Sequence, residues 1–387
     1  IKDASSAAIY GARASFGVVL ITTKSGSAKE GKPTVRYNGK VGLSAPTTRT
    51  DYESTGYWSV YINDSFYNNS FGRNWTRYTE NDMEQMWLRR NDKVENPERP
   101  WVFTEVRDGK ESYIYYCNTD WYHEMFQDIN PFTQHNVSVN GGNRFVKYFF
   151  SAGYEHKEGV FQVRPEKFNK YNLRSKTDFV LTKWMSLSNN MSFYTTDYDY
   201  PGNAGQNITF QYSGYHAFAS MPPRNPDGTW VYKTIFTDSN VANGCHMELG
   251  QDTKQNHKYR YNFSNTAELS VRPVEGLDIR ANFTYTMDNV RSWNRSTPAT
   301  YSKYPGVVET DDNGRFWNRL METYDNSKYL AANVYGTYNR TFKDRHNLQI
   351  IAGYNFETRY IKKHSTEARN LSSLYLSDYN MVLPDSD

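Results

Sequence analysis

The clearest signal along the chain is an alternation of apolar and polar residues with a period of two. In residues 277–290, for example, Leu277, Ile279 and Phe283 alternate with Asp278 and Arg280. This period predicts a β-strand with one apolar and one polar face. The pattern predicts nine strands, at residues 35–43, 132–141, 144–155, 168–180, 185–196, 257–272, 277–290, 328–342 and 347–360. Most are longer than the roughly 5–6 residues usual in globular proteins.

The connections between the predicted strands alternate between short and long. Short turns are expected at residues 141–143, 181–184, 273–276 and 343–346. Long loops are expected at residues 44–131, 156–167, 199–256, 292–327 and 362–387. Outer-membrane β-barrels have short periplasmic turns and longer outer loops, whereas a soluble sandwich has no reason to sort its loops in this order. The pattern therefore favours an all-β fold, a transmembrane antiparallel β-barrel with long extracellular loops.

Composition agrees with such a barrel and excludes some other classes. Aromatic residues make up 16% of the chain, yet the mean hydropathy is −0.84. No apolar run approaches the roughly 18–20 residues that a membrane helix needs. Lys and Arg total 45 against 42 Asp and Glu, so no net basicity indicates a nucleic-acid partner. 

The first 26 residues follow a different pattern from the rest of the chain. Small residues at positions 4–8 can form a short helix that Asp3 could cap, and the apolar run at 17–24 predicts a buried strand. Taken alone, such a strand could belong to any α/β domain.

Two runs in this segment, KDASSAAIYG and GVVLITTKSG, resemble the end of the plug domain of the SusC/RagA family of TonB-dependent outer-membrane transporters. Residues 118–121 (NTDW), 135–142 (HNVSVNGG) and 148–154 (YFFSAGY) also resemble segments of that family. The resemblance implies that residues 1–26 are the C-terminal end of an α/β plug domain, that 27–34 are a linker, and that 35–387 are the N-terminal part of the barrel. The plug-motif residues would be Asp3, Tyr10, Gly11, Arg13 and Gly17.

The number of strands implies a partial barrel. Nine strands would close to a cylinder roughly 17 Å across, which side chains would fill. A plug needs the room of a barrel of about 22 strands. The chain is therefore expected to be an internal piece of a longer protein, with about nine strands of a larger barrel.

The resemblance implies a function in transport and no enzymatic activity. The expected function is TonB-dependent active import of a large nutrient, an oligosaccharide or a peptide, across the outer membrane of a Gram-negative bacterium. The implied partners are a SusD-like surface lipoprotein, outer-membrane lipids, and a TonB–ExbB–ExbD complex acting through a plug region before Ile1. The alternatives are a passive porin-like channel, which lacks a plug, and a soluble glycan-binding β protein.

Residues in the long loops are candidates for contact with substrate or partner. Aromatic faces stack on sugar rings, and amide and carboxylate groups bind hydroxyls. The candidates are Trp121, Tyr212, Tyr215, Asn225, Asp227 and Trp230. The alternative for any one aromatic residue is packing within the loops or in the interfacial girdle.

The sequence shows no catalytic constellation and predicts no cofactor and no metal site. Its histidines lack ligand spacing, and the run from Asp311 to Gly314 is expected to be a tight turn. Cys117 and Cys245 are interpreted as unrelated thiols, although a disulfide between loops stays open. Arg13 is expected to pair with an inward carboxylate of the barrel such as Glu268 or Asp278, which would latch the plug.

Overall fold

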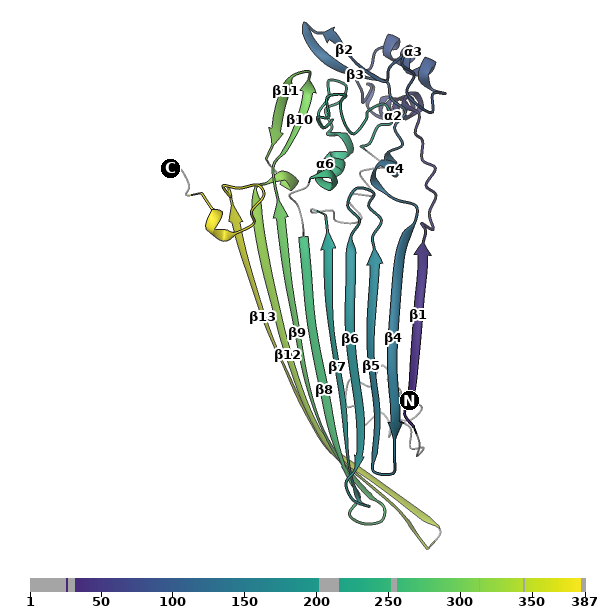
Figure 1. The fold of residues 1–387 in the computed structure, drawn as a ribbon, viewed down its shortest axis with the longest axis vertical. Coiled ribbons are helices and arrows are strands. Elements are labelled where there is room, and N and C mark those ends of the chain that lie inside the picture. Colours follow the sequence, from purple (N-terminus) through teal and green to yellow (C-terminus); the bar gives the residue numbers. More distant parts are fainter. Residues whose placement is uncertain are drawn as a thin grey trace.

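The computed structural model describes residues 26, 32–201, 216–251, 256–312, 314–343 and 345–383. Within these residues, nine strands form one antiparallel sheet in which each strand pairs with the next in the chain (Figure 1). The strands are β1 (Thr34–Ser44), β4 (Asn130–Gly142), β5 (Val146–Glu158), β6 (Lys167–Val180), β7 (Met185–Tyr200), β8 (Asn256–Val271), β9 (Leu277–Ser296), β12 (Arg319–Phe342) and β13 (His346–Arg369). The nine predicted strands are confirmed.

Three strands extend furthest beyond the bounds that the alternation indicates. β9 continues to Ser296, β12 begins at Arg319 and β13 runs to Arg369, all within segments expected to be loops. The backbone ladder continues there, because Ser296 still pairs with Arg319 and Arg319 with Arg369. Backbone pairing does not require alternating side chains, so the strands extend beyond the segments in which apolar and polar residues alternate.

The register of the sheet sorts the side chains onto two faces. Asn262 lies opposite Asp288, and Asp288 lies opposite Ser327, so polar positions share one side, the polar face. The other side, the apolar face, carries large exposed side chains such as Val35 (65% exposed) and Tyr354 (71%). An exposed apolar surface of this extent is typical of a face that contacts a membrane or another protein.

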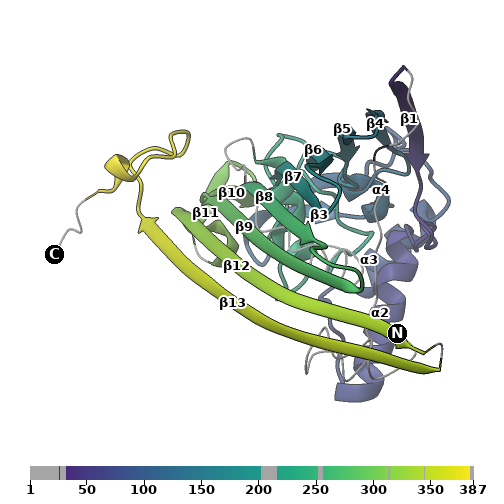
Figure 2. The ribbon, with the colours of Figure 1, turned by 90° about the horizontal axis from the view of Figure 1, so that it is seen from below.

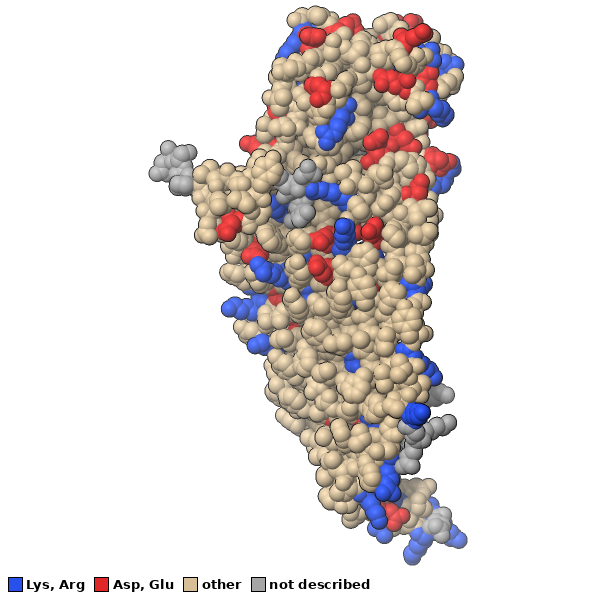
Figure 3. Space-filling view, in the orientation of Figure 1, with Lys and Arg blue, Asp and Glu red and all other residues tan. Residues whose placement is uncertain are grey.

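The charged residues are distributed accordingly. On the side shown in Figure 3, the middle and lower parts of the sheet carry few charged side chains. Most of the charged side chains on this side lie toward the loop end or at the tips of the turns. Figure 2 shows that the sheet is strongly curved, with β1 at one edge and β13 at the other. Among the described residues, no helix is long and apolar enough to cross a membrane. The fold is a curved wall of a transmembrane antiparallel β-barrel.

The long connections gather at one end of the sheet and contain further helices and strands (Figure 1). They include α2 (Gly56–Phe71), α3 (Glu80–Arg89), β2 (Val102–Arg107), β3 (Lys110–Tyr115), α4 (Trp121–Met125), α6 (Cys245–Gly250), β10 (Ala299–Tyr304) and β11 (Val307–Asp311). Short 3₁₀ helices occur at Val241–Gly244, Gly314–Phe316 and Tyr379–Met381. We call residues 56–126, 216–250 and 299–316 the loop module.

The principal hydrophobic core lies in the loop module and not in the sheet. Ile114 and Met125 come from the β1–β4 connection, and Met221, Phe236 and Leu249 come from the β7–β8 connection. Each is at most 1% exposed. A single sheet cannot bury either of its faces by itself, whereas the helices and hairpins of the module pack around one another. The segments expected to be long loops therefore fold into a packed unit with a hydrophobic core of its own.

Candidate functional site

The candidate site comprises the loop module and the polar face of the sheet below it. The predicted plug residues Asp3, Tyr10, Gly11, Arg13 and Gly17 lie outside the described residues. The predicted contact residues Tyr212 and Tyr215 also lie outside them.

Trp121 is a packing residue of the loop module. It begins α4 and is 5% exposed, and its indole Nε1 donates a hydrogen bond of 2.9 Å to the carbonyl oxygen of Phe218. Its ring meets the edge of His246 at a centroid distance of 5.2 Å. Burial leaves the indole no face for a sugar ring in this structure.

Asn225 connects three segments of the loop module. Asn225 is 4% exposed, and its Oδ1 accepts a hydrogen bond from the Tyr115 hydroxyl (2.8 Å). Its Nδ2 donates to Thr229 Oγ1 (3.0 Å) and to the Ser302 carbonyl (3.1 Å). The tight turn beyond it closes through Gly228, whose φ of 84° suits glycine. Asn225 thus holds the turn between β3 and β10.

We expect Asn225→Ala to destabilise the loop module by about 1–3 kcal/mol, because the Tyr115 hydroxyl and the Ser302 carbonyl would lose their partner in a buried place. Hydrogen exchange of β3 and β10 measures the effect. Asn63→Ala is the matched control, since Asn63 is exposed and bonds only to the Ser59 carbonyl one turn away. If exchange stayed unchanged while ligand binding fell, Asn225 would instead be a contact residue.

Asp227 is exposed at the tip of the same turn and remains available to solvent. Its Oδ2 accepts a hydrogen bond from the Tyr113 hydroxyl (2.7 Å), and its Oδ1 accepts from Thr229. Burial and this carboxylate together raise the pKa of Tyr113 to about 12. Tyr113 is therefore a neutral donor at physiological pH.

Trp230 is half-buried, and its indole is in contact with a guanidinium group and with a second aromatic ring. The guanidinium of Arg224 lies 3.3 Å from the indole centroid, and His246 meets the indole at 5.5 Å. A cation over an aromatic face is a favourable contact. Burial lowers the pKa of His246 to about 4, so this imidazole is neutral between Trp121 and Trp230.

A cluster of exposed aromatic residues of the module lies on α2 and α3. Trp58 (38% exposed), Tyr61 (49%) and Trp87 (41%) form an aromatic cluster with Tyr57. Sequence reasoning missed Trp58 and Tyr61, although their spacing of three residues would place them on one face of a helix. These rings are accessible to a ligand or a partner, whereas the predicted contact residue Trp121 is buried.

A buried ion pair holds α3 against the β2–β3 hairpin. Arg107 binds Asp82, with Nη1 2.9 Å from Oδ2, and Asp82 is fully buried. Thr79 and Asp82 form a capping box that begins α3. Burial raises the pKa of Asp82, but hydrogen bonds from Arg107, Tyr116 and Thr79 outweigh it and lower the pKa to about 2.

The polar face carries a continuous network of donors and acceptors. Arg260 binds Asp288 through Nε (2.8 Å) and Nη2 (2.7 Å), and Asn262 donates to the same carboxylate. A row of amides crosses β9, β12 and β13 from Asn282 to Asn333 to Asn355. Such a surface is suited to hydroxyl and amide groups of a hydrated solute.

This network borders a hollow of about 500 Å³ on the same face. Its lining includes Asn262, Asp288, Ser327, Tyr329, Glu357 and Arg359. The hollow is lined by both carboxylate and guanidinium groups.

One of the two partners suggested for Arg13 is already paired. Asp278 accepts hydrogen bonds from Arg272 (3.1 Å) and Arg280 (3.2 Å). Glu268 also belongs to the polar face, opposite Asn282. Because Arg13 lies outside the described residues, its pairing stays a prediction.

Cys117 and Cys245 are both buried, and no disulfide joins them. Burial raises the pKa of the Cys117 thiol, which is therefore inert at neutral pH. The expectation of unrelated thiols is confirmed.

Known proteins share sequence with this chain. No protein-family profile matches the chain. The TonB-dependent receptor P3 of Formosa agariphila is 23% identical over 364 residues, covering 92% of this chain and 30% of that protein. The TonB-dependent receptor SusC of Bacteroides thetaiotaomicron is 32% identical over 172 residues, which is 44% of this chain and 13% of that protein.

Solved structures agree in fold. The RagAB peptide importer in its closed-closed state matches with a TM-score of 0.68 at 17% identity, covering 97% of this chain and 40% of that chain. The open-open state gives a TM-score of 0.66 at 19% identity and covers all of this chain. The chain thus corresponds to well under half the length of the proteins that it matches.

A two-faced antiparallel sheet with short turns at one end and a folded loop module at the other defines an outer-membrane-type β-barrel. The chain is similar in sequence to TonB-dependent receptors, SusC among them, and similar in fold to the RagAB importer, in line with the resemblance of its sequence motifs. These relatives are receptors and importers, not enzymes, in agreement with the expected lack of enzymatic activity.

Proposed function

We propose that the protein containing this chain imports a large nutrient across the outer membrane of a Gram-negative bacterium, driven by TonB. The observation that carries the proposal is the polar face of the nine-stranded sheet, with its network of amides, carboxylates and guanidinium groups. In a closed barrel this face lines the lumen, while the apolar face meets lipid. The free edges of β1 and β13 would pair with further strands to close the wall.

The same face supports a proposal for the class of substrate. Amide rows and mixed charges bind hydroxyl and peptide groups equally well, so an oligosaccharide or a peptide fits. RagAB, which shares the fold, is a peptide importer, and this supports a peptide as the substrate.

The loop module is the proposed docking end for a SusD-like surface lipoprotein. Its aromatic cluster at Trp58, Tyr61 and Trp87 offers accessible rings of the type enriched at interfaces. Residues 1–26 would be the end of the plug, residues 27–34 a linker, and TonB–ExbB–ExbD would act through the plug region that precedes them.

Uptake in the native host tests the proposal. Deletion of the gene should abolish growth on the nutrient, and deletion of TonB should do the same with the barrel still in the outer membrane. Pull-down of the intact protein from detergent should recover a stoichiometric lipoprotein. Uptake that continued without TonB would indicate a passive channel, and a protein that needed no detergent would indicate a soluble glycan-binding protein.

A further inference from the structure

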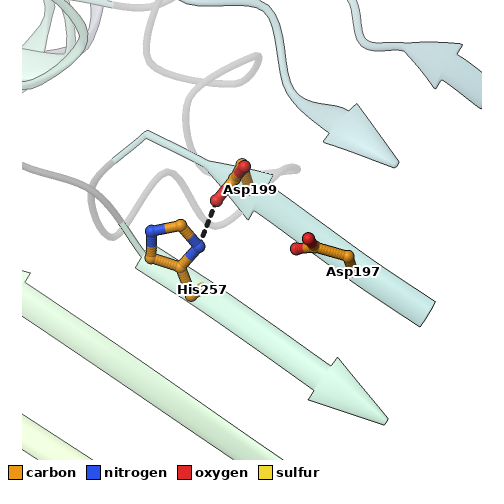
Figure 4. Close-up of side chains that lie close together, drawn as sticks. All are labelled: Asp197, Asp199 and His257. Atoms are coloured by element: carbon orange, nitrogen blue, oxygen red, sulfur yellow. Dashed lines mark ion pairs between the residues drawn. The ribbon is translucent and has the colours of Figure 1, made fainter. Parts of the chain in front are cut away.

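Three side chains of metal-ligating type converge where β7 and β8 approach the loop end of the sheet. Asp197 and Asp199 lie two residues apart on β7, and His257 lies on β8 directly opposite Asp199. One ligand atom from each residue lies within 4.8 Å of the other two. Figure 4 shows both carboxylates directed toward the imidazole.

Two carboxylates share one imidazole in this cluster, and Lys167 lies opposite Asp199 on β6. Asp199 contacts Nδ1 of His257, the same ring that Asp197 approaches. Asp197 Oδ1 is enclosed and has no hydrogen-bond partner among the described residues. Arg291, opposite Tyr259 on β9, is instead bound to Glu322 (2.8 Å).

The imidazole is held in place by its neighbours. The ring of Tyr259 stacks on His257 at 5.9 Å with planes 6° apart, and Trp293 lies at 6.2 Å on β9. Asp199 also lines a hollow of about 310 Å³ beside β6, which includes Tyr200 and Lys167. The cluster is thus ordered by packing and reachable by a small ion.

We propose that Asp197, Asp199 and His257 form a binding site for a divalent cation of the Zn²⁺ type. A divalent ion would neutralise both carboxylates and take Nδ1 of a neutral imidazole as its third ligand. Two carboxylates with one imidazole, plus an open position, is a set used by Zn²⁺, whereas Mg²⁺ and Ca²⁺ prefer oxygen ligands throughout. The site is separate from the polar face and does not depend on the proposed transport.

The chain offers a matched control in which the same residue types do not converge. His123 lies between Asp120, 2.7 Å from Nδ1, and Asp128, 3.4 Å from Nε2. Its two carboxylates occupy opposite ring nitrogens, so they cannot share one ion with the same nitrogen. An ordinary Asp–His ion pair would behave alike at both places, whereas a metal site would not.

The test is a Zn²⁺ titration by calorimetry of the intact, detergent-purified protein after removal of metals by a chelator. We expect Asp197→Asn and His257→Gln each to lose one equivalent of bound Zn²⁺ or to weaken its binding by about 100-fold or more, since even outer-shell changes cost 10–100-fold. His123→Gln should bind as the wild type does. Equal Zn²⁺ binding by the wild type, Asp197→Asn and His257→Gln would overturn the proposal.

A second measurement guards against variants that fail to assemble. Heat-modifiable migration on gels reports whether each barrel is folded, and only folded variants are compared. Co²⁺ added to the wild type should give visible absorption bands that are absent from Asp199→Asn, which keeps nearly the same side-chain volume. A wild-type protein without a saturable equivalent of either ion would refute the site regardless of the variants.

Discussion

Phe283→Arg is expected to have the largest effect on assembly of the barrel. Phe283 is 49% exposed on the apolar face of β9, between Ala267 and Ala332 on the neighbouring strands. It lies six residues beyond the start of β9, near the middle of the roughly 9–11 residues that cross a membrane. An arginine at the bilayer midplane costs about 2–4 kcal/mol. Refolding into lipid vesicles, followed by heat-modifiable migration, measures the loss.

Thr284→Arg is the matched control for this substitution. Thr284 is the next residue on β9 but belongs to the polar face, where its hydroxyl contacts that of Thr266 (2.9 Å). The new arginine would meet water and acceptor groups, so assembly should be nearly unchanged. If both variants were equally impaired, the assignment of lipid to the apolar face would be wrong.

The second large effect is expected from Arg107→Ala. This change leaves the fully buried Asp82 without its counter-ion, and breaking a buried pair on one side costs about 3–5 kcal/mol. Hydrogen exchange should show local opening of α3 and the β2–β3 hairpin while the sheet stays protected. Arg77→Ala removes an exposed pair with Asp238 and should cost about 0–1 kcal/mol. Equal protection in both variants would contradict the prediction.

The same pair makes the loop module sensitive to acid. Because the pKa of Asp82 is lowered to about 2 in the folded module, its stabilisation is present above the ordinary value of 3.8. It is lost as the pH falls from that value through about 2. Tryptophan fluorescence should therefore report loosening of the module at the acid end of this window, and Arg107→Ala should show a smaller pH dependence there.

The sequence by itself determined the nine strands, their two faces and the end at which the long connections lie. Each strand carries its own alternation, as in residues 277–290, so its identity depends on local residues and not on distant partners. The short turns could be predicted because only a few residues separate adjacent alternating segments. One signal in the loops was also readable, since Thr79 and Asp82 have the spacing of a capping box.

Only the tertiary structure decided what the loop residues do. Trp121 and Asn225 were plausible contact residues from composition, but the carbonyls and hydroxyls that bury them come from remote segments. The ion pair of Asp82 with Arg107 and the convergence of Asp197 with His257 likewise join separate elements. Alternation along a strand is a property of neighbouring residues. A packed module, or a cluster of two carboxylates and an imidazole, depends instead on which distant segments the fold brings together. No local pattern in a single sequence specifies which distant segments meet.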